Sequence, residues 1–125
     1  MCGIIGYNGN NDTLGVILDG LAAIEYRGYD SAGYAVLDEK KQLTVRKTQG
    51  GADALNEIAG GHGKTHLGIG HTRWATHGVP SERNAHPHTA RNITLVHNGI
   101  IENFEQLRAK LQKKGVSFVS DTDTE

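Results

Sequence analysis

The single cysteine of this 125-residue chain occupies position 2, directly behind the initiator methionine. If Met1 is removed, Cys2 becomes the N-terminal residue and carries both a thiol nucleophile and a free α-amine that can act as its base. An α-amine titrates near pH ~8, so part of it is neutral at physiological pH. With Met1 attached the amine is tied up in a peptide bond. A fold that uses Cys2 as a nucleophile must place the start of the chain inside a site. The alternative to a nucleophile is that Cys2 is only a small buried residue at the start of a strand.

Apolar periodicity predicts a chain of mixed helices and strands. Residues 13–26 have one apolar face at helical spacing, formed by Leu14, Ile17, Leu18, Leu21 and Ile24. Residues 101–113 give the clearest helix, with one apolar side made of Ile101, Phe104, Leu107 and Leu111. A short helix is predicted over 52–59, followed by a glycine- and histidine-rich loop at 60–65. Strands are predicted over 2–8, 32–37, 43–48, 66–72, 92–97 and 116–120.

Composition narrows the class of protein. The formal net charge is −1 and no basic block is present, so nucleic acid is not an expected partner. One cysteine excludes an internal disulfide and is typical of a reducing compartment. The start lacks a signal-peptide pattern and no apolar run approaches membrane-spanning length, so we expect a cytoplasmic protein without a membrane partner. The chain stops at Glu125 just after an acidic, hydroxyl-rich run, which we interpret as a truncation.

Four polar clusters stand apart from the periodic segments, and each has a simple alternative explanation. Residues 27–33 (RGYDSAG) lie between a predicted helix and a predicted strand, where a capping glycine and a solvated Arg–Asp pair would suffice. Residues 120–125 (SDTDTE) offer carboxylates for a substrate ammonium. A polar helix N-cap explains the same spacing equally well.

The third cluster, residues 71–78 (HTRWATHG), ends a predicted strand. Its arginine, Arg73, offers a planar fork for a carboxylate, and Thr76 and His77 add neutral hydrogen-bonding groups. The alternative is an ordinary surface loop anchored by Trp74.

The fourth cluster, residues 97–103 (HNGIIEN), carries a strand into a helix through Asn98 and Gly99. The Asn98 amide and the Gly99 N–H, close to a helix start, could cradle a developing oxyanion. Losing one such donor typically costs about 2.7–4 kcal/mol of transition-state stabilisation. A tight Asn-Gly turn is the alternative interpretation.

Seven histidines invite a metal interpretation. However, no HExxH, CxxC or paired-carboxylate pattern surrounds them. We therefore predict neither a metal nor a cofactor, and we rank a zinc-binding structural module last among the alternatives.

Together these clusters resemble the N-terminal glutaminase domain of the glutamine–fructose-6-phosphate aminotransferase (isomerising) family, also called glucosamine-6-phosphate synthases. Six segments carry the resemblance, in the family's order: MCGI at the start, EYRGYDSAG from Glu25, GHTRWATHG from Gly70, NAHPH from Asn84, HNGIIEN from His97 and SDTDTE from Ser120.

The resemblance implies catalytic roles. Cys2 would be the nucleophile, with its freed amine as general base. Arg27 and Gly28 would flank the nucleophile and order it. Asn98 and Gly99 would form the oxyanion hole.

It also implies a substrate pocket for L-glutamine. Arg73 would bind the α-carboxylate of glutamine and Asp123 its α-ammonium. Thr76 and His77 would line the same pocket. Trp74 would stand at the mouth of an ammonia channel.

The fold implied by the resemblance is α+β, a four-layer αββα sandwich of the N-terminal-nucleophile hydrolases, incomplete at its C-terminus. Residues 1–125 would be the N-terminal part of a type-2 glutamine amidotransferase domain. Glutamine hydrolysis would supply ammonia that converts fructose 6-phosphate to glucosamine 6-phosphate. The sugar-phosphate isomerase domains that bind fructose 6-phosphate are absent here, and the full-length enzyme is expected to be a homodimer.

Two other functions stay open. A phosphoribosylpyrophosphate amidotransferase would use Cys2, Arg27-Gly28 and Asn98-Gly99 in the same roles. Tyr29 and the Trp-Ala-Thr-His run favour the glutamine–fructose-6-phosphate aminotransferase family instead. An inactive fragment that binds glutamine without turning it over is the other alternative, and a retained Met1 would favour it.

Overall fold

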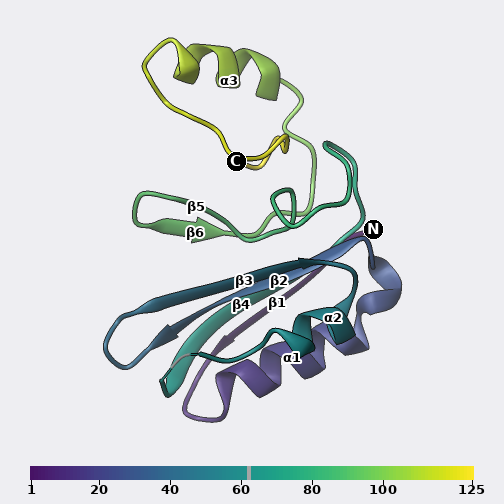
Figure 1. Ribbon diagram of the computed structural model, residues 1–125, viewed down its shortest axis with the longest axis vertical. Coiled ribbons are helices and arrows are strands. Elements are labelled where there is room, and N and C mark those ends of the chain that lie inside the picture. The colour runs from purple at the N-terminus through teal and green to yellow at the C-terminus, as the bar shows by residue number, and fades with distance from the viewer. Residues whose placement is uncertain (62) are drawn as a thin grey trace.

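The computed structural model describes residues 1–61 and 63–125, so one residue of the predicted 60–65 loop, His62, lies outside the described part. Its main sheet has four antiparallel strands in the order β1-β4-β2-β3. They are β1 (Gly3–Asn8), β2 (Ser31–Asp38), β3 (Leu43–Gln49) and β4 (Thr65–Arg73). Figure 1 shows helices α1 (Thr13–Ala23) and α2 (Ala52–Glu57) together on one face of this sheet.

A second, two-stranded sheet lies over the other face (Figure 1). It pairs β5 (His88–Ala90) with β6 (Ile93–Leu95), and helix α3 (Phe104–Gln112) lies beyond it. The layers therefore run helix, sheet, sheet, helix, which is the α+β sandwich that the family resemblance implies. No helix in the described ranges is long and apolar enough to cross a membrane.

Helix α1 packs directly on the main sheet because its apolar face meets glycines on β4. Leu14, Ile17 and Leu21 are buried there, as the periodicity predicts. A Cβ placed on Gly70 would lie 2.7 Å from Ile17 Cγ2, inside van der Waals contact. Glycine at this position therefore sets how closely the helix approaches the sheet.

We expect Gly70→Ala to lower the free energy of unfolding by about 1–3 kcal/mol, because an added methyl group overpacks the α1–β4 contact. Gly6→Ala is the matched control, since a Cβ on Gly6 in the neighbouring strand meets nothing within 4 Å. Urea unfolding of the two variants measures the difference. Equal stability of both variants would show that α1 can move away from the sheet at little cost.

Most predicted elements are confirmed, with shifted ends. The helix predicted over 13–26 ends at Ala23 and continues as a 3-10 turn over Glu25–Arg27. The strand predicted over 92–97 is only Ile93–Leu95, and its partner β5 was not predicted. The helix predicted over 101–113 begins at Phe104, and none of its residues is buried.

The strand predicted over residues 116–120 is wrong. The segment is irregular and has no partner strand. Its backbone groups are satisfied elsewhere, because the N–H groups of Val119 and Ser120 donate to the two carboxylate oxygens of Glu125, at 2.8 and 2.6 Å. Alternation of apolar and polar residues predicts an extended segment, but it cannot tell a sheet partner from a carboxylate that takes the same hydrogen bonds.

Candidate active site

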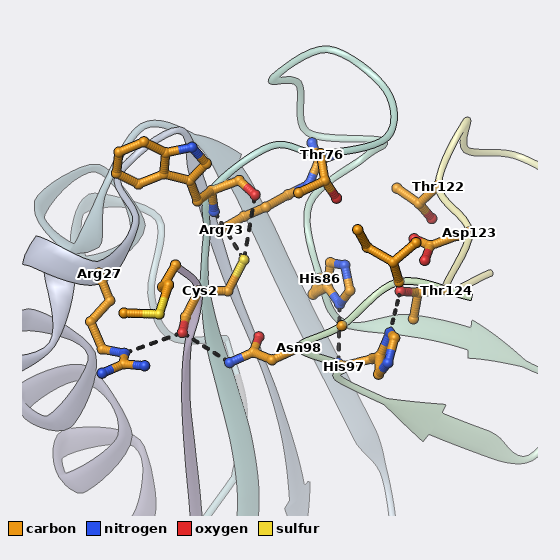
Figure 2. A pocket seen from close by; sticks show the side chains of 14 residues that line it. Cys2, Arg27, Arg73, Thr76, His86, His97, Asn98, Thr122, Asp123 and Thr124 are labelled. Carbon is orange, nitrogen blue, oxygen red and sulfur yellow. Dashed lines mark hydrogen bonds between the residues drawn. The ribbon is translucent and has the colours of Figure 1, made fainter. Parts of the chain in front are cut away.

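The predicted site residues gather at the end of the main sheet where β1 begins and β4 ends. A cavity of about 420 Å³ opens there (Figure 2). Eight of the ten predicted residues line it: Cys2, Arg27, Arg73, Trp74, Thr76, Asn98, Gly99 and Asp123. Gly28 and His77 do not line it. Residues from distant parts of the chain thus share one pocket around the cysteine.

Three segments hold Cys2 in place. The backbone N–H of Trp74 donates to Cys2 Sγ at 3.1 Å, and the thiol lies 3.4 Å from the Trp74 carbonyl oxygen. The Cys2 carbonyl accepts from Arg27 Nε at 3.3 Å and from Asn98 Nδ2 at 2.9 Å. The main chain at Cys2 is therefore fixed while its sulfur faces the pocket.

Gly28 acts beneath the pocket and not in its wall. A Cβ there would lie 2.6 Å from the carbonyl carbon of Arg73 and 2.9 Å from the nitrogen of Trp74. Only glycine lets the segment after Arg27 lie this close to the strand end that carries Arg73 and Trp74. Arg27 thus holds the Cys2 carbonyl by a hydrogen bond, while Gly28 packs against the backbone of Arg73 and Trp74.

Arg73 is almost completely buried, and its guanidinium anchors the loop that follows it. It donates to the carbonyls of His77, of Gly78 at 3.0 Å and of Val79 at 3.4 Å. Burial lowers the pKa of Arg73, while the nearby Cys2 and carboxylates raise it. These bonds involve three of the five N–H donors of an arginine, so positive charge and further donors remain for the cavity that Arg73 lines.

His77 is not among the residues that line the cavity. Its ring meets the edge of Phe104 in α3, with ring centroids 4.8 Å apart. Only its backbone carbonyl, which accepts from Arg73, connects it to the site. His77 therefore shapes the loop around Thr76, which does line the cavity.

Asp123 lies across the pocket from Cys2 on the loop at 120–125 (Figure 2). Asn84 Oδ1 accepts from the N–H of Asp121 at 2.9 Å, and Arg108 donates to the Ser120 carbonyl at 2.6 Å. Asp123 Oδ2 accepts the Ile101 N–H at 2.8 Å, which leaves its other oxygen outside that bond.

Asn98 and Gly99 form the wall next to Cys2. Asn98 Oδ1 lies 2.8 Å from His71 Nε2, and its Nδ2 donates to the Cys2 carbonyl. Gly99 has φ +154, and a Cβ there would lie 2.8 Å from the ring of His97. Glycine therefore suits this position on both conformational and steric grounds.

A cluster of histidines packs under the pocket, and site reasoning from the sequence missed it. His71 and His86 stack with centroids 4.1 Å apart, and His86 meets His88 edge-on at 4.7 Å. Burial lowers the pKa of His71 and of His88 to about 4, and lowers that of His86 further. The three rings are therefore neutral at physiological pH and add no charge to the site.

Further lining residues were also missed: Met1, His86, His97, Ile100, Thr122 and Thr124. The NAHPH and HNGIIEN segments contained His86, Ile100 and His97, so their motifs were the available signal. Thr122 Oγ1 is hydrogen-bonded to His88 Nε2 at 3.1 Å, and Thr124 Oγ1 lies 3.2 Å from His97 Nδ1. Among residues 1–61 and 63–125, no three His, Cys, Asp or Glu side chains are grouped to hold a metal ion.

Curated relatives resemble the chain over its whole length. It is 55% identical to glutamine–fructose-6-phosphate aminotransferases (isomerising) of Chlamydia pneumoniae and Vibrio cholerae, over 128 and 131 residues. It is 52% identical to the enzyme of that name from Escherichia coli K12. In each case all of this chain matches, and it spans about a fifth (21%) of the relative's length.

Solved structures support the same class of fold. A glutamine phosphoribosylpyrophosphate amidotransferase from B. subtilis superposes with a TM-score of 0.80 at 28% identity. A structure described as the allosteric regulatory enzyme of purine biosynthesis gives 0.81 at 29% identity. Both cover 99% of this chain and 28% of the solved one.

The family model described as glutamine amidotransferase domain matches residues 48–125, more than half of the chain. That stretch contains Arg73, Asn98 and Asp123, which line the pocket around Cys2. The chain therefore belongs to the glutamine amidotransferase domain family.

Proposed function

We propose that Cys2, after removal of Met1, is the nucleophile of a glutaminase whose substrate is L-glutamine. The observation that carries this proposal is the position of Cys2 Sγ, which receives the Trp74 N–H at the floor of a pocket lined by Arg73, Asn98 and Asp123. A small molecule with a carboxylate, an ammonium and an amide has a complementary group for each of these side chains.

The chemistry proceeds in two steps. Cys2 Sγ attacks the side-chain carbonyl carbon of glutamine, and the α-amine of Cys2 takes the thiol proton. The tetrahedral intermediate collapses, the C–N bond breaks, and the amine returns the proton to the departing ammonia. Water then attacks the thioester, the C–S bond breaks, and glutamate leaves while the thiol is restored.

The oxyanion of each tetrahedral intermediate is stabilised by Asn98 and Gly99 in this proposal. The amide nitrogen of Asn98 carries two hydrogens, and one of them is used by the Cys2 carbonyl. The second, together with the Gly99 N–H, is free to meet the oxyanion. Arg27 and Gly28 hold the main chain of Cys2 throughout.

Glutamine is oriented by groups at the opposite end of the pocket. Arg73 meets its α-carboxylate and Asp123 its α-ammonium, with Thr76 beside them and His77 fixing the loop. Trp74 is half exposed and its ring meets that of Tyr29 edge-on at 6.0 Å. We place it at the mouth through which ammonia leaves.

For the whole protein, we propose that residues 1–125 are the N-terminal part of a type-2 glutamine amidotransferase domain. Sugar-phosphate isomerase domains outside this chain would pass the ammonia to fructose 6-phosphate and give glucosamine 6-phosphate, in a cytoplasmic homodimer. The relatives that carry this name are 51–55% identical to the chain, which supports the proposal. The phosphoribosylpyrophosphate amidotransferase that superposes on it is 28% identical and is the second candidate.

A product assay on the full-length protein separates the two candidates. With glutamine present, it receives either fructose 6-phosphate or phosphoribosylpyrophosphate, and the aminated sugar is identified by mass. We expect glucosamine 6-phosphate with the first and no product with the second. Phosphoribosylamine alone would support the second candidate, and no glutamate release with either would overturn the glutaminase proposal.

A further inference from the structure

The orientation of the Asn98 amide follows from a neighbour that can only accept. Asn98 has one side-chain terminus 2.9 Å from the Cys2 carbonyl oxygen and the other 2.8 Å from His71 Nε2. A carbonyl oxygen has no hydrogen to give, so the terminus facing Cys2 must be the NH₂ group. The terminus facing His71 is then the amide oxygen, which can only accept. His71 Nε2 must therefore carry a hydrogen and donate it.

The His71 side chain is held in place by burial and by ring packing. It lies on β4, an inner strand of the main sheet between β1 and β2, and its side chain is fully buried. The ring of His86 stacks against it, nearly parallel at 12°. Gly33 makes room for the backbone of His86, because a Cβ on Gly33 would lie 2.0 Å from the His86 carbonyl oxygen.

The charge state of His71 agrees with a single donated hydrogen. Burial lowers its pKa to about 4, against the raising effect of its hydrogen bond with Asn98. Between pH ~5 and ~8 the ring is therefore neutral and has one N–H, since a neutral imidazole carries a hydrogen on one nitrogen only. The Asn98 oxygen is the acceptor that selects Nε2.

We propose that His71 is a positioning residue: together with the Cys2 carbonyl, its Nε2–H holds the Asn98 amide at both ends, with the NH₂ group toward Cys2 and the oxyanion. Without this bond only the contact with the Cys2 carbonyl remains, and the amide can swing away from the reacting centre. The inference rests on the proposed function for its effect on catalysis, and on the hydrogen-bond chain alone for its effect on the orientation of Asn98.

The test uses four variants of the full-length protein: His71→Leu, His71→Gln, Asn98→Ala and the double variant His71→Leu/Asn98→Ala. Removing a single oxyanion donor lowers kcat by about 10²–10³-fold. We expect His71→Leu to lower kcat for glutamate release by about 10–100-fold, with KM for glutamine changed less than about twofold. His71→Gln, whose amide can donate in place of Nε2–H, should recover most of the loss.

The double variant separates positioning from general loss of structure. If His71 acts only through Asn98, adding His71→Leu to Asn98→Ala causes no further loss of kcat. Thr13→Val is the matched control for a lost buried hydrogen bond, because Thr13 Oγ1 donates to the Thr65 carbonyl at the other end of β4, and it should leave kcat unchanged. Independent, multiplying losses in the double variant, or a His71→Leu enzyme with wild-type kcat, would overturn the inference.

A crystal structure of His71→Leu tests the inference even if the unaltered protein releases no glutamate and the proposed function fails. We expect the Asn98 side chain to shift, so that the 2.9 Å contact between its NH₂ group and the Cys2 carbonyl lengthens or is lost. An Asn98 side chain that stays in place with this contact intact would overturn the positioning role by itself.

Discussion

Replacement of Cys2 by alanine is expected to reduce glutamate release by at least about 10⁴-fold, the scale seen when a nucleophile is deleted from a covalent mechanism. Cys2 is the only cysteine in the chain, so no other thiol can replace it. Its sulfur is also the atom that receives the Trp74 N–H at the pocket floor. The measurement is the rate of glutamate formation at saturating glutamine.

Two controls make this loss specific. Cys2→Ala should keep the melting temperature and the glutamine affinity of the unaltered protein, because the backbone carbonyl that Arg27 and Asn98 hold is still present. Cys2→Ser keeps the size of the side chain and tests whether a hydroxyl can replace the thiol. A Cys2→Ala variant that still releases glutamate at more than about a hundredth of the normal rate would remove cysteine from the mechanism.

A retained residue in front of Cys2 is the second change with a large expected effect. General-base catalysis contributes typically about 10²–10⁴-fold, so a blocked α-amine should lower kcat by about that factor. A short N-terminal extension ending in a protease site before Cys2 allows the same preparation to be assayed before and after cleavage. We expect glutamate release to rise by about 10²–10⁴-fold on cleavage, with N-terminal sequencing to confirm a free Cys2.

The pocket itself provides the competing explanation. His97 lines the cavity and has an imidazole that could act as base in place of the amine. Its Nδ1 lies 3.2 Å from Thr124. If the uncleaved chain turned over as fast as the cleaved one, the amine would be excluded and His97 would become the base to test. A Cys2→Ala variant carried through the same cleavage controls for activity from the protease preparation.

Local patterns were enough to predict the four strands of the main sheet and α1, and α1 buries one regular face. Ile17 and Leu21 repeat at helical spacing and both are fully buried. The second half of the chain was predicted less well. Helix α3 buries none of its residues, and the N–H groups of Val119 and Ser120 donate to the Glu125 side chain and not to a partner strand.

Short motifs predicted most of the residues that line the candidate site, such as Cys2 behind Met1 and the Asn98-Gly99 pair. Residues that reach the site through contacts across the chain were missed. The contacts of His71 with Asn98 and of His88 with Thr122 join residues 27 and 34 positions apart. No spacing rule connects such pairs, so only the fold could reveal the histidine cluster beneath the pocket.

A nucleophilic Cys2 in a glutamine pocket is tested most simply by the intact mass of the protein before and after treatment with 6-diazo-5-oxonorleucine, a glutamine-like electrophile, followed by peptide mapping. We expect a chain without Met1 and a single adduct on Cys2 that excess glutamine prevents. An accessible Cys2 with a free amine and no adduct, or an adduct that glutamine does not prevent, would contradict this expectation.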